Sequence, residues 1–426
     1  MNVTVVCDVL GEANNGTTVA ALNLINSLID KGHSVKVVCP DKERGGQENF
    51  CVVPVRNLGY IINKILEKNN VKLAKPDEKI LTSAIKDADA VHIICPFVLA
   101  RKAIEIARRL NIPVTAGFHC QAENFTAHIG FMKNGLINKI VYSKFYNTVF
   151  KYCDAIHYPT QFIRDQFENS VKRETKGYVI SNGVSEEFFR EEKGEAQKSG
   201  TQLDIKQVQT LQTDVKAAEK EKFRLVCTGR LSTEKAQHVL IEAAALSKYK
   251  DRLFIAFAGQ GPKKEKLQKL AQKRNVDCTF NFYSRVKLIE LLRSSDLYVH
   301  TSYAEIEAIA CLEAIASGLV PVICDSKKSA TRAFALDGNN LFASNDPHSL
   351  AQKIDFWIEN QALKREYVKK YQGMINGYGR KACMDKMEKM LFNAAEEKRG
   401  QAIVEKIEDA SVQNETVEEG AVKEAV

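Results

Sequence analysis

The stretch YVHTSYAEIEAIACLEAIASGLVPVIC, residues 298–324, decides the fold. It predicts a buried strand ending at Val299, a polar loop over 300–304, a helix over 305–317 and a second strand over 320–324. A strand, a helix and a strand in this order form the crossover unit of a parallel sheet. We therefore expect an open α/β sheet that binds ligands at the carboxyl ends of its strands.

Two carboxylates, Glu305 and Glu313, stand eight residues apart in the expected helix. At about 3.6 residues per turn they lie near one helical face, about 12 Å apart along the axis. The residues between them are small or apolar, so an anion such as a phosphate can approach the backbone N–H groups at the helix start. Two glutamates on a helix are more often simply solvated, and the spacing alone identifies no reaction.

This stretch resembles the signature of a known family. Glu305, seven residues, Glu313 and the following Ala-Ile-Ala-Ser-Gly-Leu-Val-Pro-Val resemble the donor-site motif of family 4 retaining glycosyltransferases, which have the GT-B fold. The string Glu-Ile-Glu-Ala-Ile-Ala-Cys-Leu-Glu-Ala-Ile is similar to one branch, the bacterial 1,2-diacylglycerol 3-glucosyltransferases. The common family form has Phe-Gly early in this motif, where this chain has Ala308-Ile309, a departure shared with that lipid branch. The resemblance extends over roughly residues 1–395.

Composition bounds the class of protein. The chain has 426 residues, of which 45% are hydrophobic and 27% charged, which is typical of a globular protein with two domains. It has no run of about 18 apolar residues, and its N-terminus is interpreted as a strand rather than a signal peptide because Asp8 interrupts the apolar run. The 11 cysteines form no CxxC pair, which indicates free thiols in a reducing cytoplasm.

The net charge of +8 belongs to a basic body, because the tail 400–426 is acidic. A basic body suits an anionic partner, either nucleic acid or an anionic membrane surface. The sequence contains no recognisable RNA- or DNA-binding motif, so we expect no nucleic-acid partner.

Alternating β and α patterns predict two Rossmann-like doubly wound domains. We expect an N-terminal domain over 1–189, a charged linker or insertion over 190–222, a second domain over 223–395, and a disordered acidic tail over 396–426. The resemblance implies that the two domains face a cleft. It also implies that the first domain faces acceptor and membrane, that the second binds the nucleotide sugar, and that the last helices pack back toward the first.

Two loops of the first domain are candidate ligand sites. Asn15-Gly16 precedes a helix and suits an anion or sugar, although a plain turn explains it equally well. His119 follows the strand expected over 113–118, where a lone histidine is more often structural. The family has a loop facing the acceptor and the donor phosphates at the first place, and a histidine contacting the transferred sugar at the second.

The second domain begins with a strand followed by two cations, Arg230 and Lys235, which suit a diphosphate at the end of a parallel strand. The family pattern Gly-Arg-Leu-x-x-Glu-Lys-Gly matches here, except that Ala236 replaces the last glycine. By the same resemblance, the turn containing Gly261 lies near the nucleotide, and the segment around Arg285 holds the base through its backbone.

Two basic amphipathic segments, 58–75 and 131–152, suit a membrane interface, although each also suits a helix packed on the sheet. The resemblance to lipid enzymes favours membrane contact and makes 58–75 the stronger candidate. Its expected apolar face and the lysines beside it include Ile61, Ile62, Lys64, Ile65 and Lys68.

The reaction implied by the resemblance is transfer of glucose from UDP-glucose to the 3-hydroxyl of diacylglycerol, with retention at the anomeric carbon. Arg230 and Lys235 then stabilise the leaving diphosphate, and Glu313 holds the ribose. Glu305 orients the sugar, which His119 contacts from the other domain. Backbone N–H groups at Ala308, Ile309 and Ala310 support sugar and phosphate.

The sequence has no evident covalent nucleophile, so front-face displacement is the implied route. It has no Asp-x-Asp motif or metal cluster, so we expect neither a cofactor nor a metal. We expect a cytoplasmic protein attached peripherally to the inner face of the cell membrane.

Three other interpretations stay open. One is a relative that uses another hexose or a non-lipid acceptor, which lipid dependence would distinguish. An inert nucleotide-binding or membrane scaffold with this fold is a second, and the intact Glu305, Glu313, Arg230 and Lys235 argue against it. A basic nucleic-acid binder is a third, and its affinity would fall steeply with salt.

Overall fold

Two parallel sheets organise the chain, one of seven strands and one of six. The computed structural model describes residues 1–8, 10, 16–57, 59, 73–127, 134–190 and 222–423, the last part of this range, 403–423, by its backbone alone. The chain divides into two compact units, each containing one sheet. The first unit comprises Met1–Ala122, Asn134–Ile180 and Met384–Val426, and the second comprises Glu123–Lys133 and Ser181–Cys383.

The sheet of the first unit has the strand order β3-β2-β1-β4-β5-β6-β7, and all neighbouring strands pair in parallel. The chain builds one half outward from β1 and then returns to add β4 on the other side of β1. The strand order therefore reverses between β1 and β4, which is where open α/β sheets bind their ligands. The strands are β1 (Asn2–Val6), β2 (Ser34–Cys39), β3 (Phe50–Val52), β4 (Ala90–Ile93), β5 (Val114–Gly117), β6 (Ala155–Tyr158) and β7 (Gly177–Val179).

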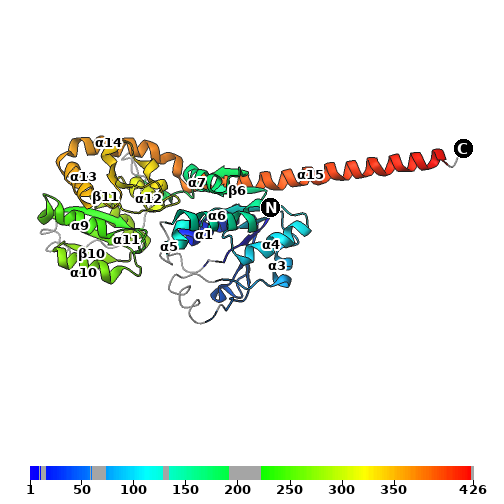
Figure 1. Cartoon of the computed structure of the whole chain (residues 1–426), viewed down its shortest axis with the longest axis horizontal. Helices are drawn as coiled ribbons and strands as arrows, with labels where there is room; N and C mark the ends of the chain where they lie inside the picture. The colour runs from blue at the N-terminus through cyan, green and yellow to red at the C-terminus, as the bar shows by residue number, and fades with distance from the viewer. Residues whose placement is uncertain are drawn as a thin grey trace, which may run out of the picture. The chain divides into compact units, whose positions relative to one another are not determined.

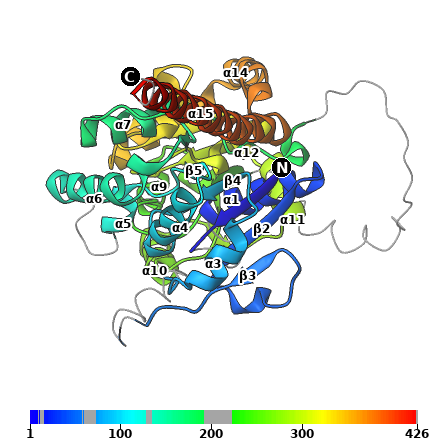
Figure 2. The same ribbon diagram turned by 90° about the vertical axis from the view of Figure 1, so that its right-hand side faces the viewer.

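Helices between these strands make the parallel crossovers, and Figures 1 and 2 show them packed around the sheet. Their apolar faces are buried and their polar faces are exposed, as in α4, where both C-terminal arginines lie on the outside. These helices are α1 (Gly16–Asp30), α3 (Glu78–Ile85), α4 (Val98–Arg109), α6 (Gly135–Thr148) and α7 (Gln161–Val171). The short helix α5 (Ala122–Ala127) lies between β5 and α6 in the chain and, from Glu123 on, belongs to the second unit.

The sheet of the second unit has the order β10-β9-β8-β11-β12-β13, again with all pairs parallel. Its order reverses between β8 and β11. The helix α9 packs against α10 and α13, whereas α12 packs against α14. The elements are β8 (Phe223–Thr228), α9 (His238–Leu246), β9 (Leu253–Ala258), α10 (Lys264–Arg274), β10 (Cys278–Asn281), α11 (Arg285–Arg293), β11 (Leu297–His300), α12 (Ile309–Ala316), β12 (Pro321–Asp325), β13 (Leu341–Ala343), α13 (Pro347–Glu359) and α14 (Gln361–Ile375).

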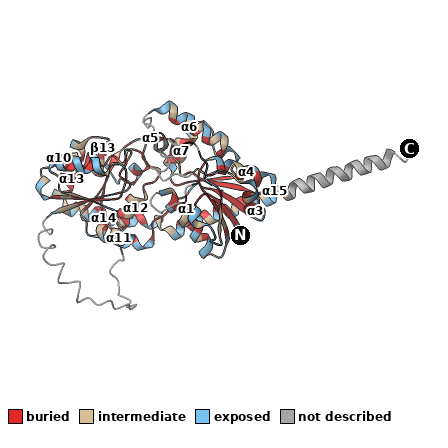
Figure 3. Cartoon of the chain, turned by 90° about the horizontal axis from the view of Figure 1, so that it is seen from below, coloured by how far each residue is buried: buried red, intermediate tan, exposed pale blue. Residues whose placement is uncertain are grey.

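Each unit has its own buried core, and Figure 3 shows the buried residues concentrated on the strands and the exposed residues on the outer helix faces. The single tryptophan of the chain, Trp357 on α13, is fully buried in the core of the second unit. Two Rossmann-like doubly wound domains were predicted from the sequence, and the two sheets confirm that prediction.

The C-terminal end differs from its prediction. The helix α15 runs from Arg380 to Lys423, whereas 396–426 was predicted to be a disordered tail. The prediction relied on the scarcity of large apolar residues, but helix formation also depends on local propensity. This segment contains no proline and many alanines, glutamates and lysines, which favour a helix by their intrinsic propensity.

Candidate active site

Glu305 lies in a loop and not on the helix. The helix α12 begins at Ile309, so the predicted helix start at residue 305 and the shared helical face with Glu313 were wrong. The backbone of Glu305 instead pairs with the segment after β12, accepting a hydrogen bond from Ala330 N (3.0 Å) and donating one to Lys328 O (3.3 Å). Because Ala308 adopts left-handed dihedral angles (φ 63°, ψ 60°), the helical path cannot extend back to Glu305.

The carboxylate of Glu305 forms an ion pair with Lys235. The Nε2 atom of His300 lies 3.4 Å from the same carboxylate oxygen. Lys235 follows β8, whereas His300 ends β11, and the strand order of the sheet reverses between these two strands. The ion pair therefore lies at the position where a doubly wound sheet binds its ligand.

Burial controls the ionisation of this cluster. Burial by itself would raise the pKa of Glu305, but the charge of Lys235 and the neighbouring His300 outweigh it and hold this pKa far below its usual value. For Lys235, burial lowers the pKa, but Glu305 more than compensates and the pKa is raised. Burial also lowers the pKa of His300, so its imidazole is neutral at pH 7. The pair therefore stays charged across the physiological range.

A polar chain continues from His300 into the core. Its Nδ1 lies 3.1 Å from Tyr298 Oη, which lies 3.2 Å from Thr228 Oγ1. All three residues are buried. This chain orients the imidazole, because a buried hydrogen-bonded ring has few other orientations available.

The loop carrying Arg230 and Lys235 is held by backbone contacts. Thr301 Oγ1 donates to Lys235 O (2.6 Å), and Tyr303 N donates to Glu234 O (2.8 Å). Gln237 Nε2 donates to Arg230 O (2.8 Å). These contacts join the loop after β8 to the loop after β11, so the two predicted cations and Glu305 come together at one edge of the sheet.

Gly261 lies close to the backbone of this loop, at Leu231. A Cβ at Gly261 would overlap the backbone of Leu231, whose N–H donates to Gln260 O (2.9 Å). Glycine is therefore required there for close backbone approach. This is a structural reason for the glycine, and binding of a nucleotide by Gly261 stays a prediction.

Two alanines adopt the left-handed conformation that favours glycine, Ala236 (φ 49°) and Ala308 (φ 63°). At Ala236 the family has glycine, as noted from the sequence. In the later motif the left-handed residue is Ala308, whereas Ile309 is the first residue of α12.

Glu313 lies on α12 and is half-buried. Burial raises the pKa of this carboxyl to about 7, although the charge of Arg285 acts in the opposite direction. Arg285 is the first residue of α11, with its Nε 3.2 Å from Glu187 Oε2 and its guanidinium over the ring of Phe188. The structure thus brings Glu313 within the electrostatic influence of Arg285.

In the first unit, His119 follows β5. Its imidazole ring lies so close to Gly117 that a Cβ added at Gly117 would overlap it. Burial lowers the pKa of His119 well below its usual value, and the nearby His157 and His92 lower it further. Thr17 Oγ1 donates to the backbone oxygen of His119 (3.4 Å). Because Gly16 is the first residue of α1, the structure places the predicted Gly16 and His119 side by side at one end of this sheet.

The predicted membrane residues Ile61, Ile62, Lys64, Ile65 and Lys68 lie outside the described residues. Among the residues that the structure describes, no group of three or more histidines, cysteines and carboxylates is arranged to hold a metal ion. No helix in the same part of the chain is long and apolar enough to cross a membrane.

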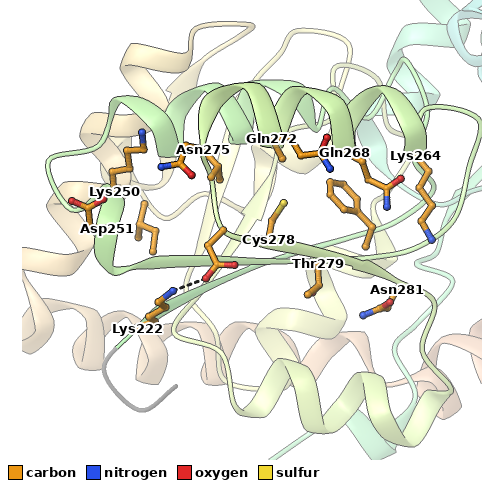
Figure 4. Close-up of a pocket in the computed structure, with 15 residues that line it drawn as sticks. Lys222, Lys250, Asp251, Lys264, Gln268, Gln272, Asn275, Cys278, Thr279 and Asn281 are labelled. Atoms are coloured by element: carbon orange, nitrogen blue, oxygen red, sulfur yellow. Dashed lines mark hydrogen bonds and ion pairs between the residues drawn. The ribbon is translucent and has the colours of Figure 1, made fainter. Parts of the chain in front are cut away.

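A separate groove of about 800 Å³ runs along the edge strand β10 (Figure 4). Gln268 and Gln272 of α10 line one side of the groove and Thr279 of β10 lines the other. Lys222 and Asp277 form an ion pair at its margin, with Nζ and Oδ2 2.5 Å apart. None of the residues that line it is a predicted site residue.

Reasoning from sequence missed His300, Tyr298 and Glu307. His300 and Tyr298 were assigned to a strand and its following loop without a role, although a histidine that ends a strand at a switch point is a detectable signal. Glu307 was interpreted only as part of a motif string. Its buried contacts with Ser181 and Asn182 join residues far apart in the chain.

Fold and site define a class of protein. Two doubly wound domains, together with a half-buried lysine paired with a buried glutamate beside a helix N-terminus at a sheet switch point, are typical of proteins that bind a phosphate-containing nucleotide ligand.

Comparison with known proteins identifies the family. The model described as Glycosyltransferase Family 4 matches residues 14–188, and the model described as Glycosyl transferases group 1 matches residues 208–373. The chain belongs to these glycosyltransferases and has the GT-B fold, as its resemblance in sequence implied.

Three similar proteins extend this result. Alpha-monoglucosyldiacylglycerol synthase of Streptococcus pneumoniae is 25% identical over 317 residues, which are 72% of this chain and 67% of that protein. HepE of Anabaena, solved in complex with UDP-glucose, is 14% identical with a TM-score of 0.67, covering 92% of this chain and all of HepE, and shares the fold. The catalytic domain of cholesterol-alpha-glucosyltransferase of Helicobacter pylori is 46% identical over 37% of this chain and 98% of that domain, with a TM-score of 0.36.

Proposed function

We propose that this glycosyltransferase moves a glucosyl group from UDP-glucose to the 3-hydroxyl of 1,2-diacylglycerol, with retention, to make membrane glycolipid. Two findings support the donor and the acceptor. HepE, which has the same fold, binds UDP-glucose. The relative from S. pneumoniae is named as a synthase of a monoglucosyldiacylglycerol.

The observation that carries the proposal is the ion pair of half-buried Lys235 with buried Glu305, in which Lys235 belongs to the same loop as Arg230. A lysine ammonium has three N–H donors, so Lys235 can hold Glu305 and a phosphate oxygen together. Lys235 and Arg230 stabilise the negative charge that develops on the departing UDP. Glu305, fully ionised, accepts a hydrogen bond from the sugar 3-hydroxyl and orients the sugar.

The helix α12 supplies the remaining donor contacts. The first N–H groups of an α-helix have no partner within the helix, so those of Ile309 and Ala310, next to Ala308, are available to sugar and phosphate oxygens. Glu313 accepts hydrogen bonds from the ribose hydroxyls, which satisfy a half-buried carboxylate.

In the first unit, His119 is the proposed sugar-binding residue and Gly16 the proposed anion-binding residue. The backbone of the segment at Arg285 binds the base, and the turn containing Gly261 lies near the nucleotide. The two cations perform the electrostatic task of a divalent metal, so the reaction needs neither metal nor cofactor. With no covalent nucleophile, displacement on the front face of the donor retains the anomeric configuration.

A lipid acceptor requires contact with a membrane, and α6 offers a suitable surface. Leu136 and Ile140 are 70% and 60% exposed and lie one turn apart, and Lys139 and Lys144 are exposed on the same helix. Exposed aliphatic side chains beside lysines suit the interface of an anionic membrane. The segment 58–75 remains the other candidate, and we propose peripheral attachment to the inner face of the cell membrane through one of the two.

The first test is transfer of labelled glucose from UDP-glucose into a product extracted by organic solvent. Diacylglycerol is supplied in mixed micelles with and without anionic lipid. We expect labelled lipid from the wild type, dependent on anionic lipid, and its loss in Glu305→Gln and Arg230→Ala. A wild type that binds UDP-glucose and labels only soluble acceptors would contradict the lipid acceptor. A wild type that binds no nucleotide sugar would leave the inert scaffold as the better explanation.

The second test concerns α6. Sedimentation with anionic vesicles is measured for the wild type and for Leu136→Ser/Ile140→Ser. The matched control is Leu246→Ser on α9, which removes an aliphatic side chain that is 47% exposed in the second unit. We expect weaker binding only for the double variant. Equal binding of all three proteins would exclude α6 and direct attention to 58–75.

A further inference from the structure

Glu307 is a buried carboxylate, 3% exposed, that accepts hydrogen bonds from a distant segment. One of its oxygens accepts from the Ser181 hydroxyl and from Asn182 N (3.1 Å). The other accepts from Asn182 Nδ2 (2.6 Å) and lies 3.2 Å from the same backbone N. The carboxylate therefore acts only as an acceptor, and three separate donors converge on it.

The segment bound by Glu307 is the place where the chain enters the second unit. The middle segment of the first unit ends at Ile180, so Ser181 and Asn182 are the first residues of the long segment Ser181–Cys383 of the second unit. Two residues on, Val184 pairs with the segment by which the chain returns: Val184 N donates to Tyr378 O (2.7 Å), and Arg380 N donates to Val184 O (2.8 Å). Glu307 thus binds one of two chain segments that are joined to each other by backbone hydrogen bonds.

The other neighbours of Glu307 in sequence are site residues. Glu305 stands two positions before it, and the left-handed Ala308 directly follows it. The backbone from Glu305 to α12 is therefore fixed by the hydrogen bond from Ala330 N at one end and by the side chain of Glu307 near the other. Without the second anchor, this backbone would lose the contact that holds Ala308 in an unfavourable conformation.

We infer that Glu307 is a positioning residue: by binding Ser181 and Asn182, it holds Glu305 and the start of α12 in the orientation that the sugar donor requires. The inference rests on the proposed function and deepens it, since the donor site is the same. A carboxylate in this role adds a requirement for ionisation.

That requirement gives the role a signature. Burial raises the pKa of Glu307 to about 7, and the hydrogen bonds from Ser181 and Asn182 limit the increase. Burial raises the pKa of the nearby Tyr378 phenol, and the charge of Glu307 raises it further, so this phenol is neutral at pH 7. A protonated Glu307 must donate one hydrogen bond, although the groups around it are donors, so the anchor weakens as the pH falls below 7.

The experiment compares full-length wild type, Glu307→Gln and Asn182→Asp between pH 5.5 and 8.5. Glutamine keeps the size of the side chain but turns one amide N–H₂ toward the donors of Asn182, and it cannot ionise. We expect Glu307→Gln to lower kcat about tenfold at pH 8, with the KM for UDP-glucose changed less than threefold, and to flatten the acid limb of the profile. Asn182→Asp places a second carboxyl against Glu307 and is expected to move the acid limb to higher pH.

A binding measurement keeps the inference separate from the acceptor. Glu305 contacts the sugar, so the wild type binds UDP-glucose more tightly than UDP. We expect Glu307→Gln to reduce that ratio while UDP affinity stays unchanged. A wild-type ratio together with a wild-type pH profile would overturn the inference, whatever the thermal stability of the variant. A wild type that binds UDP-glucose but transfers nothing to lipid contradicts the proposed acceptor alone, and a wild type that binds neither ligand contradicts both.

Discussion

The ion pair of Lys235 and Glu305 predicts a large and pH-dependent coupling energy. Replacing Lys235 by Met leaves a carboxylate whose side chain is 10% exposed without its main partner. Removing one member of a buried pair costs about 3 to 5 kcal/mol, and because Lys235 itself is 22% exposed we expect a value of about 3 kcal/mol. Glu305→Gln leaves the less buried cation and should cost about 2 kcal/mol.

The double variant Lys235→Met/Glu305→Gln carries neither charge. It should therefore lose much less than the sum of the single variants, which corresponds to a coupling energy of about 2 kcal/mol. Urea unfolding monitored by the fluorescence of Trp357 measures this quantity, because the only tryptophan lies in the core of the second unit, where the pair also lies.

The sign of the pH dependence follows from the pKa of Glu305. In the wild type this pKa lies below the unfolded value of 4.5, so the stabilisation is complete above pH 4.5 and is lost only as the pH falls through the folded pKa. In Lys235→Met, burial is no longer outweighed and raises this pKa above 4.5, so the variant loses stability as the pH rises. Its deficit should be larger at pH 8 than at pH 5.5. Additive single variants, or a deficit that is larger at pH 5.5, would refute this account of the site.

Three further predictions concern the surrounding residues. Ala236→Gly should leave the free energy of unfolding within about 1 kcal/mol of the wild type, because relief of the left-handed conformation offsets the greater freedom of the unfolded chain. The control Ala314→Gly, inside α12, should destabilise the protein by about 1 kcal/mol or more, and equal losses for the two variants would contradict backbone strain at Ala236. UDP affinity measured by calorimetry should rise up to about tenfold from pH 6 to pH 8, because Glu313, with a pKa of about 7, ionises over this range. Glu313→Gln should remove this rise in affinity, and a rise that persists in the variant would assign the pH dependence to another group. Gly261→Ala should destabilise the second unit by about 1 to 3 kcal/mol in urea unfolding, because its Cβ would overlap the backbone of Leu231. The control Gly373→Ala, in an open position on α14, should stabilise the unit by up to about 1 kcal/mol, and similar shifts for both variants would show that Gly261 does not closely approach Leu231.

Local patterns in the sequence were sufficient for the architecture. Apolar runs separated by amphipathic helices predicted two parallel sheets, because burial on both faces of a strand requires a continuous apolar segment. The positions of His119, Arg230 and Lys235 after strands were correct for the same reason, since a loop that follows a parallel strand always leaves the sheet at its carboxyl edge. The family also followed from a short motif.

Only the tertiary structure decided how the candidate site is assembled. Spacing placed Glu305 on a helix, but Lys235, 70 residues away in the chain, pairs with it in a loop. Glu307 gained its partners from residues 125 and 126 positions earlier in the chain, which no periodicity within its own segment reveals. Such contacts depend on which strands become neighbours. The ion pair of Lys235 and Glu305 therefore forms only when β8 and β11 are neighbours. The contacts of Glu307 form only when the segment at Ser181 and Asn182 packs beside the loop after β11.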